Sequence, residues 1–521
     1  MKKYYLLIVV TFLLFNFFAF AVIGNSQTDE FAFYAYNSSP VTDWDPSVEF
    51  SNGIVSLNNV YETLLRYDPL EDKFVKLLAT DYTTSSDGLT WTFTLRKGVK
   101  FHDGTNFNAD AVKFSVERTI NMNKGASFIW APVDKVNVID DYTVEFKLKY
   151  PAPLDLICSS GYAAFIMSPT AVKSHPDSWL TEGHEAGTGP YLLESYQQER
   201  GEVELTWFKD YWGGWEGNHF KKAVIKDVSE AVTRHLLIEK GEADITIELP
   251  YEDIASLQDN KNVNVLIGPS FQNLILFFNT EKEPLNNKLL RQALSYAFPY
   301  EDVVSYCLEG YGRQGRGPVP YGLWGHSEEL FQYKYDLNKA KELLEKAGYA
   351  KGDLKLLLTY MSGDEAERKT VELFKAKLAE LNIDLEIRGM PWESQWALAR
   401  DNNSDKRQDI FIMYWWPDVC DPHCWLYSNF YSEEEPFFNL CYYKNQEFDS
   451  LVDKGFKESG IDRNKATKTY IDAQNILVED APVVFIYDKK NIYSLNKTFQ
   501  GFKDNPAYAN VVFFYDTYRE K

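Results

Sequence analysis

The chain has 521 residues, of which 45% are hydrophobic and 16% aromatic, and its formal net charge is −22. This acidic balance argues against a nucleic-acid-binding protein, which needs a basic face, and against adhesion to anionic lipid. The length exceeds what one hydrophobic core organises, so two or three domains are predicted. Most of the 13 Trp, 34 Tyr and 35 Phe belong in the core, and so large a surplus also suits a groove that stacks on a ligand.

The N-terminus has the layout of a secretory signal peptide. Lys2 and Lys3 precede an apolar stretch from Tyr4 to Ala21, whose last residues, Ala19-Phe20-Ala21, place small side chains where a signal peptidase reads them. A retained membrane anchor is the alternative, because the apolar run is near the length that spans a bilayer. No Cys lies near residue 21, so a lipoprotein anchor is not predicted. We predict that residues 1–21 are removed and that the mature protein is periplasmic or otherwise extracytoplasmic.

Strands and helices alternate through the first half of the chain, an α/β pattern. Leu89 to Leu95 alternates apolar and polar side chains as a half-buried strand does. Asn108 is placed to cap a helix from Ala109 to Ile120, with Asp110 in its first turn. Further predictions are paired strands within 136–148, a strand at 225–229 and a helix at 230–240, ended by Gly241.

The second half continues the same alternation. The segments 355–360, 367–381 and 383–388 form a strand–helix–strand unit, which favours a parallel pair of strands. Asp336 is placed to cap a helix at 338–347. Also predicted are strands at 274–279, 410–415 and 483–487, helices at 287–297 and 463–481, and an aromatic loop after residue 415.

The five cysteines are too few for a disulfide scaffold. In an oxidising compartment one local disulfide is predicted, joining Cys441 to Cys424 or to Cys420. The odd count leaves at least one free thiol. The run from Cys420 to Cys424 also contains His423, but no second Cys/His pair follows at ligand spacing, so no metal site is predicted.

Motifs of catalysis are missing from the sequence. It contains no H-E-x-x-H helix, no G-x-S-x-G elbow and no Walker A loop. Gly310 to Gly315 matches G-x-G-x-x-G but leads into Pro318 and Pro320, where a dinucleotide site needs a helix. Nothing local singles out a glycosidase-like pair among the 76 carboxylates. We therefore predict a protein that binds a small molecule, is not an enzyme and needs no cofactor.

One long block of the sequence is specific enough to indicate a family. It comprises residues 78–80, 86–105, 107 and 112–118, and it includes Trp91, Phe101-His102-Asp103-Gly104-Thr105 and Arg118. Further blocks follow in order at 187–191, 211–214, 278–280, 284–285, 291–297, 340–344, 347–349, 415–418 and 421–422. Together they resemble the family 5 extracellular solute-binding proteins, the oligopeptide, dipeptide and nickel class of ABC importers. The resemblance covers about residues 30 to 520.

The resemblance implies an α/β, type II periplasmic-binding-protein-like fold with three lobes and a hinged ligand cleft. Lobe I would comprise residues 28–59, 186–280 and 487–521, lobe II residues 60–185 and lobe III residues 281–486. The ligand would lie between lobes I and III. The resemblance also implies a monomer whose partners are its small-molecule ligand and an ABC permease and ATPase complex at the inner membrane.

Asp418 is the first candidate ligand residue. In peptide-binding members of the family, an Asp at this place in the loop takes the α-amino group of the ligand, a charge-assisted hydrogen bond. The alternative is an Asp that only starts the turn at Pro422. Trp415 and Trp416 flank Asp418 and either stack on the ligand or pack the lobe, and Trp392 resembles a family Trp that lines the groove.

The other candidates come from lobe I. Glu49, Phe50 and Ser51 match the segment that pairs with peptide backbone as an added strand. Phe271 and Gln272 lie where lobe I is expected to cross toward lobe III.

The chemical class of the ligand stays open at this point. Asp418 favours peptides, whereas the three candidate tryptophans and the aromatic surplus favour oligosaccharides. Pro417 and Val419 also depart from the residues that many peptide binders carry beside this Asp. A nickel complex or haem is a third reading. A secreted hydrolase is an alternative of a different class, and a chemoreceptor partner without transport is not distinguished by sequence.

Overall fold

Residues 31–349 and 354–520 are described in the structure, a computed structural model. They build an 11-stranded mixed sheet in the order β15-β14-β16-β12-β17-β11-β1-β10-β9-β8, with β13 paired to β17. The strands of this sheet are β1 Phe31–Tyr36, β8 Tyr191–Gln197, β9 Glu202–Trp207, β10 Lys222–Asp227, β11 Ile245–Ile247, β12 Val263–Phe278, β13 Gly312–Gln314, β14 Lys355–Met361, β15 Asp384–Met390, β16 Ile410–Trp415 and β17 Val483–Asn496.

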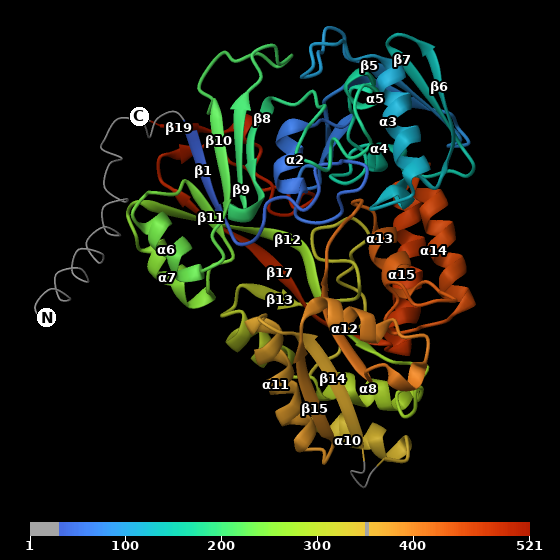
Figure 1. The fold of residues 1–521 in the computed structure, drawn as a ribbon. Helices are drawn as coiled ribbons and strands as arrows, with labels where there is room; N and C mark the ends of the chain where they lie inside the picture. The colour runs from blue at the N-terminus through green and yellow to red at the C-terminus, as the bar shows by residue number, and fades with distance from the viewer. Residues whose placement is uncertain (1–30, 350–353, 521) are drawn as a thin grey trace, which may run out of the picture.

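The two longest strands, β12 and β17, connect the two ends of this sheet. They pair antiparallel from Val263 opposite Asn496 to Phe277 opposite Val483, with an irregularity between Pro269 and Asn273. Figure 1 shows them crossing the middle of the molecule. The predicted strands at 274–279 and 483–487 are therefore confirmed but too short, because the halves toward β11 are only partly buried and lack a continuous apolar run.

The β1 region, defined here as β1 with β8–β11, packs its own core around Tyr34, Trp44, Tyr191 and Ile225. β1 lies parallel to β10, in register from Phe31 opposite Lys222. The helices and short strands around it are α2 Ile54–Val60, α6 Ala231–Glu239, α7 Tyr251–Gln258, η2 Gln198–Arg200, η5 Phe514–Asp516, β18 Phe499–Gln500 and β19 Tyr518–Arg519.

The β5 region is built around a separate four-stranded sheet in the order β4-β5-β7-β6, at the upper right of Figure 1, and also contains the two-stranded sheet of β2 and β3. Asn108 caps α3 by accepting from the backbone N–H of Ala111, as predicted. The predicted strands at 89–95 and within 136–148 are confirmed. Its elements are β2 Leu65–Asp68, β3 Lys73–Lys76, β4 Ala79–Thr84, β5 Thr90–Leu95, α3 Ala109–Met122, η1 Ser127–Trp130, β6 Val133–Asp140, β7 Thr143–Leu148, α4 Leu154–Ile157 and α5 Pro169–Lys173.

The β14 region surrounds β14, β15 and β16 and buries both faces of the sheet. Leu274 and Leu276 of β12 face one hydrophobic core, while Ile275 and Phe277 face a second, as the twofold alternation of a strand requires. The predicted parallel pair is confirmed, since β14 lies parallel to β15. The helices are α8 Lys288–Ala297, α9 Tyr300–Asp302, η3 Val303–Cys307, α10 Leu337–Lys346, α11 Glu365–Ala379, α12 Trp392–Ala399, η4 Ser404–Lys406, α13 Pro422–Phe430, α14 Gln446–Ser459 and α15 Arg463–Asp480.

Helix α13 occupies part of the segment predicted as an aromatic loop. Asp421 accepts a hydrogen bond from the backbone N–H of His423, and Pro422 fills the first helical turn, where a missing N–H costs nothing. The cap thus turns the chain into a helix directly after the loop that carries Asp418.

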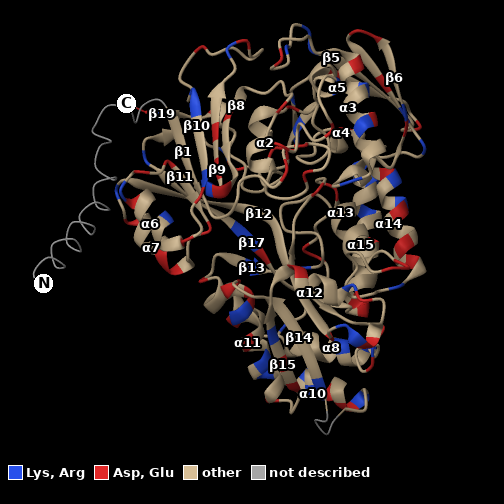
Figure 2. Cartoon of the chain, in the orientation of Figure 1, with Lys and Arg blue, Asp and Glu red and all other residues tan. Residues whose placement is uncertain are grey.

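Acidic and basic side chains are interspersed over all three regions, as Figure 2 shows. Among residues 31–349 and 354–520, no helix combines the length and apolarity needed to cross a membrane. The predicted signal peptide, residues 1–21, lies outside the described residues. The lobe boundaries stay a prediction, and the cores do not follow them strictly, since Phe165 and Leu180 pack with the β1 region.

Candidate ligand-binding site

A cleft lies where the β1 region meets the β14 region. It consists of two adjoining cavities of about 420 and 310 Å³. Glu248 from the β1 region, Asp364 and Tyr414 from the β14 region, and Lys489 of β17 line both of them. The cleft walls therefore come from segments far apart in the sequence, and β17 passes between them.

Three of the predicted ligand residues line the smaller cleft cavity. Ser51, Gln272 and Trp416 meet there, and the Trp416 side chain stays 39% exposed. Gln272 lies within the irregular stretch of the β12–β17 ladder. Phe50 lies behind this wall, with its ring edge-on to Tyr162 at 5.2 Å between centroids, and Tyr162 itself lines the cavity.

Asp418 is a buried carboxylate, and no cation among residues 31–349 and 354–520 pairs with it. It is 6% exposed, and its carboxylate accepts only the thiol of Cys424, at 3.7 Å. Its backbone carbonyl accepts the hydroxyl of Ser160 at 2.7 Å, which fixes the loop against the β5 region. Burial raises the pKa of Asp418 to about 7, and only the Cys424 thiol opposes that rise. An uncompensated buried charge is costly, so this position favours a ligand that brings a positive charge.

A third cavity, of about 580 Å³, lies between the β5 region and the β14 region, with Asp418 on its wall. Aromatic rings line much of it. They include Phe128, Tyr150, His423, Tyr427, Tyr431 and Phe456. Phe128 also contacts Phe50, at 5.8 Å between ring centroids. Phe50 therefore contacts both Phe128, which lines this aromatic cavity, and Tyr162, which lines the cleft.

Glu49 is placed differently from its prediction as a ligand residue. Its carboxylate accepts the hydroxyl of Thr42 at 2.6 Å and the backbone N–H groups of Asp43 and Gly53 at 2.7 and 3.0 Å. The side chain is 3% exposed and closes its own loop. Glu49 therefore shapes the segment that presents Ser51 and lines neither cleft cavity.

Three further candidates pack within the β14 region. Trp415 is 7% exposed, with its ring 5.0 Å from Phe438, and Phe271 is 1% exposed in the same core. Trp392 packs on Trp396 at 5.3 Å and lines none of the three cavities. Of the three candidate tryptophans, only Trp416 faces the cleft.

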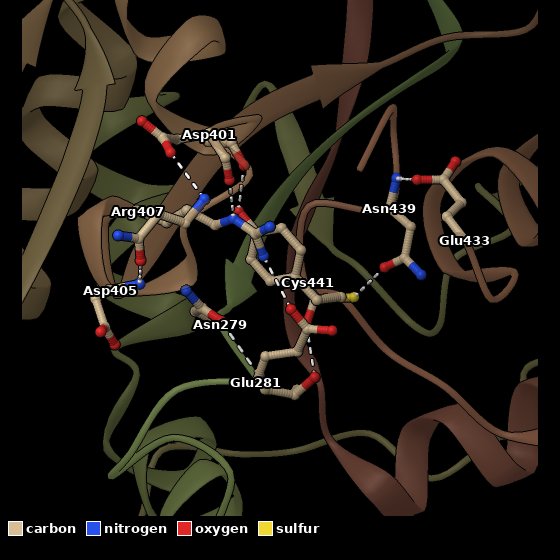
Figure 3. A network of polar contacts seen from close by, with 12 residues as sticks. Asn279, Glu281, Asp401, Asp405, Arg407, Glu433, Asn439 and Cys441 are labelled. Carbon is tan, nitrogen blue, oxygen red and sulfur yellow. Dashed lines mark hydrogen bonds and ion pairs between the residues drawn. The ribbon is translucent and has the colours of Figure 1, made fainter. Parts of the chain in front are cut away.

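The predicted disulfide between Cys441 and Cys424 or Cys420 is wrong for this structure, where all three thiols are free. Cys424 lies in α13 beside Asp418. Cys441 instead donates to the side-chain oxygen of Asn439 at 3.2 Å, as Figure 3 shows, and its carbonyl accepts from the backbone N–H of Thr280. Closeness in sequence does not bring the sulfurs together, because α13 and the end of β12 hold them apart.

The loop that carries Cys441 is held in place by a network of charges (Figure 3). Glu281 accepts from Arg407 at 2.9 Å and from Lys444 at 2.8 Å. These contacts fix the chain after α13 to the end of β12. The network in Figure 3 also includes Glu433, which accepts the backbone N–H of Asn439 at 3.3 Å and lines the aromatic cavity.

We predict that thiol titration of the denatured, unreduced protein will find all five cysteines free. The expected result follows because each sulfur is buried and none is bonded to another. A dithionitrobenzoate assay measures it, with a fully reduced sample as control. A count two thiols lower would show that a disulfide forms.

Sequence reasoning missed the charged pair of the cleft. Lys489 contacts Glu248 at 2.5 Å. Burial opposes the charge on Lys489, but Glu248 and Asp364 outweigh it and raise the pKa of the lysine. No local signal marks these residues, because Lys489 lies beyond the predicted strand at 483–487 and its partners are distant in sequence. In residues 31–349 and 354–520, no group of three or more His, Cys, Asp or Glu side chains could hold a metal ion.

Two regions joined by long strands around a cleft can close on a ligand by hinge motion, as periplasmic binding proteins do. Residues 73–437 match the family described as bacterial extracellular solute-binding proteins, family 5 middle, and the chain belongs to this family. The resemblance and the type II periplasmic-binding-protein-like fold are thereby confirmed.

Individual relatives extend over most of the chain. The probable D,D-dipeptide-binding periplasmic protein DdpA of Escherichia coli K12 is 30% identical over 477 residues, 90% of each chain. The glutathione-binding protein GsiB of Salmonella typhimurium is 28% identical over 474 residues, 89% of this chain and 90% of the relative. The structure of Helicobacter pylori DppA in complex with the peptide STSA superimposes with a TM-score of 0.81 at 25% identity, covering 94% of this chain and 98% of that one.

Proposed function

We propose that the chain captures a peptide in the cleft and delivers it unchanged to an ABC permease and ATPase complex. The observation that carries the proposal is Asp418, a buried carboxylate beside which the described part of the chain places no cation. A ligand ammonium would form a charge-assisted hydrogen bond there and repay the cost of burial. The relatives named above support the ligand class, since their names or complexes refer to a dipeptide, glutathione and a peptide.

Asp418 lines the aromatic cavity, which Phe50 connects to the cleft through its contacts with Phe128 and Tyr162, and the cleft itself suits an extended backbone. Ser51 and Trp416 line the same cavity from the two sides, and Gln272 lines it from the strand between them. Polar groups that line this cavity can form hydrogen bonds with the backbone of an extended ligand. The flanking cavities would then set the preference for particular ligand side chains. Peptides of different sequence would share this backbone contact.

The structure gives less support to an oligosaccharide. That alternative needs several exposed tryptophan faces, but Trp415 is buried and Trp392 packs on Trp396 away from the cavities. Trp416 alone is available in the cleft. A hydrolase is disfavoured because the family is one of solute-binding proteins. We also propose a monomeric periplasmic protein exported by residues 1–21.

A thermal-shift screen tests the ligand class. We expect short peptides with a free amino group to raise the Tm, because a ligand that binds only the native state stabilises it, by about 2.7 kcal/mol at a concentration 100 times Kd. Matched concentrations of α-linked and β-linked oligosaccharides are expected to leave the Tm unchanged. A shift with the sugars alone would overturn the peptide assignment. Chromatography of the peptide after long incubation is expected to recover it intact, and cleavage products would support the hydrolase reading.

A further inference from the structure

The aromatic cavity of about 580 Å³ has one wall built from a series of rings in contact, some stacked and some tilted. The ring of His423 lies 4.1 Å from that of Phe456 and 4.7 Å from that of Tyr427, and Tyr431 continues the series at 4.6 Å. Burial lowers the pKa of His423 to about 3, so the ring is uncharged near neutral pH. The wall therefore offers uncharged aromatic groups to whatever enters the cavity.

The facing wall comes from the β5 region. Phe128 lines the cavity and its side chain is still 46% exposed, whereas the Tyr150 ring packs 6.4 Å from Phe456 and joins the two walls. Aromatic rings bury large areas and pair favourably with other rings, so a half-exposed Phe beside an apolar cavity has surface left for a ligand. The cavity is thus suited to an inserted ring or a long apolar side chain.

Four carboxylates and Lys457 line the polar part of this cavity. Two of the carboxylates are already engaged, since Glu433 accepts the backbone N–H of Phe437 and Asp453 accepts the hydroxyl of Tyr431. No residue described in the structure supplies a cation to Asp418, which lines the cavity. Asp421 also lines it, and one of its oxygens accepts from His423 and Tyr470 while the other is buried without a hydrogen-bond partner. The charge of Arg463 faces Asp421 but not Asp418. A positive group on the ligand is therefore best placed at Asp418, with the apolar group beyond it.

We propose that this cavity holds the side chain of the ligand's first residue, so that the protein selects peptides whose amino-terminal residue is large and aromatic. The inference rests on the proposed function, because Asp418 must hold the amino group at the cavity wall. The volume of about 580 Å³ exceeds that of either cleft cavity and falls in the range of small-molecule sites. The rest of the peptide would run past Phe50 and Tyr162 into the cleft.

Two tripeptides of equal composition test the proposal by calorimetry. Phe-Ala-Ala places the ring in the aromatic cavity, whereas Ala-Phe-Ala has the same hydrophobicity and charge with the ring one residue later. We expect Phe-Ala-Ala to bind at least about tenfold more tightly, since burying one Phe ring is worth that much or more. Equal affinities, or tighter binding of Ala-Phe-Ala, would overturn this inference and leave peptide capture intact. Failure of these and all other peptides to bind would overturn the proposed function instead.

A variant of the aromatic cavity tests whether the preference for an aromatic first residue arises there. Ala131 is an exposed residue at the cavity rim, and Ala131→Phe would occupy space that the ligand ring needs. We expect the affinity ratio of the two tripeptides to fall close to one. Ala379→Phe, at the exposed end of α11, is the matched control and should keep the ratio. If Ala131→Phe does not fold, Tyr427→Ala removes part of the opposite wall and should lower the ratio too. An unchanged ratio in the folded variant would contradict the proposal.

Discussion

Asp418→Asn is expected to weaken peptide binding by about 30-fold or more while the protein stays folded. The asparagine keeps the shape of the side chain and removes the charge that would hold the ligand ammonium. Truncating one partner of a buried charged hydrogen bond costs about 2–5 kcal/mol, and 1.4 kcal/mol is about tenfold in Kd. Calorimetric titration with a tight-binding peptide at pH 8, alongside thermal melting of the free protein, measures both quantities.

The stability of the variant has its own expected direction. Burial raises the pKa of Asp418 from the ordinary value of 3.8 to about 7, so the native state binds this proton more tightly than the unfolded chain does. The carboxylate therefore costs stability as the pH rises from about 4 through 7, and at pH 8 its removal should leave the Tm unchanged or higher.

Asp409→Asn is the matched control for Asp418→Asn. Asp409 is also a buried carboxylate of the β14 region, but it is paired with Lys282 at 2.8 Å and accepts the backbone N–H of Leu357 at 2.7 Å. Removing its charge should lower the Tm and leave peptide affinity unchanged. Retained affinity in Asp418→Asn would contradict the assignment of this residue. Equal losses in both variants would indicate a general effect of neutralising buried carboxylates.

Peptide affinity is expected to fall as the pH drops below about 7. In the free protein the carboxyl of Asp418 takes up a proton near that pH, and only its ionised form attracts an ammonium. Affinity should therefore decline by up to about tenfold per pH unit on the acidic side. On the alkaline side it should decline again, because the α-amino group of a peptide loses its proton near pH 8. The expected profile is a bell with its maximum between those two values.

Proton release distinguishes this origin of the pH dependence from others. Calorimetry at pH 6 in buffers of different ionisation enthalpy should show that binding releases close to one proton, since the ligand displaces the proton from Asp418. Asp418→Asn should abolish both the release and the acidic limb of the bell. The same slope in the variant would place the titrating group elsewhere.

The parts of the fold that follow from local pattern were predictable. Asn108 and its helix depend on neighbouring residues alone, and so does the β14–α11–β15 unit. The full lengths of β12 and β17 were not predictable, because apolar and polar side chains alternate irregularly in the halves that lie in the β1 region. These halves are strands because they pair with each other. Helix α13 did carry a readable signal, the Asp421-Pro422 start, which the surrounding aromatic residues obscured.

The candidate site divides in the same way. Asp418, Trp416 and Ser51 were found through the family resemblance, and the structure places them around cavities that no local pattern reveals. Glu49 has the residue type of a ligand group, but donors four to seven residues away already use its oxygens. Lys489 could not be singled out, since its role arises only where β17 passes Glu248. The residue types indicated which side chains are able to bind a ligand. They did not indicate which of these side chains lie together in the folded protein.

The irregular stretch between Pro269 and Asn273 has a thermodynamic consequence. Here the ladder that joins the β1 and β14 regions is interrupted, and the same stretch supplies Gln272 to the cleft wall. The same segment therefore influences both the angle between the two regions and the binding of a ligand in the cleft. Coupling of this kind is reciprocal. If the ligand favours one angle, a membrane partner that prefers that angle raises the affinity for the ligand by the same factor by which the ligand raises the affinity for the partner. Release then requires a partner that prefers the other angle.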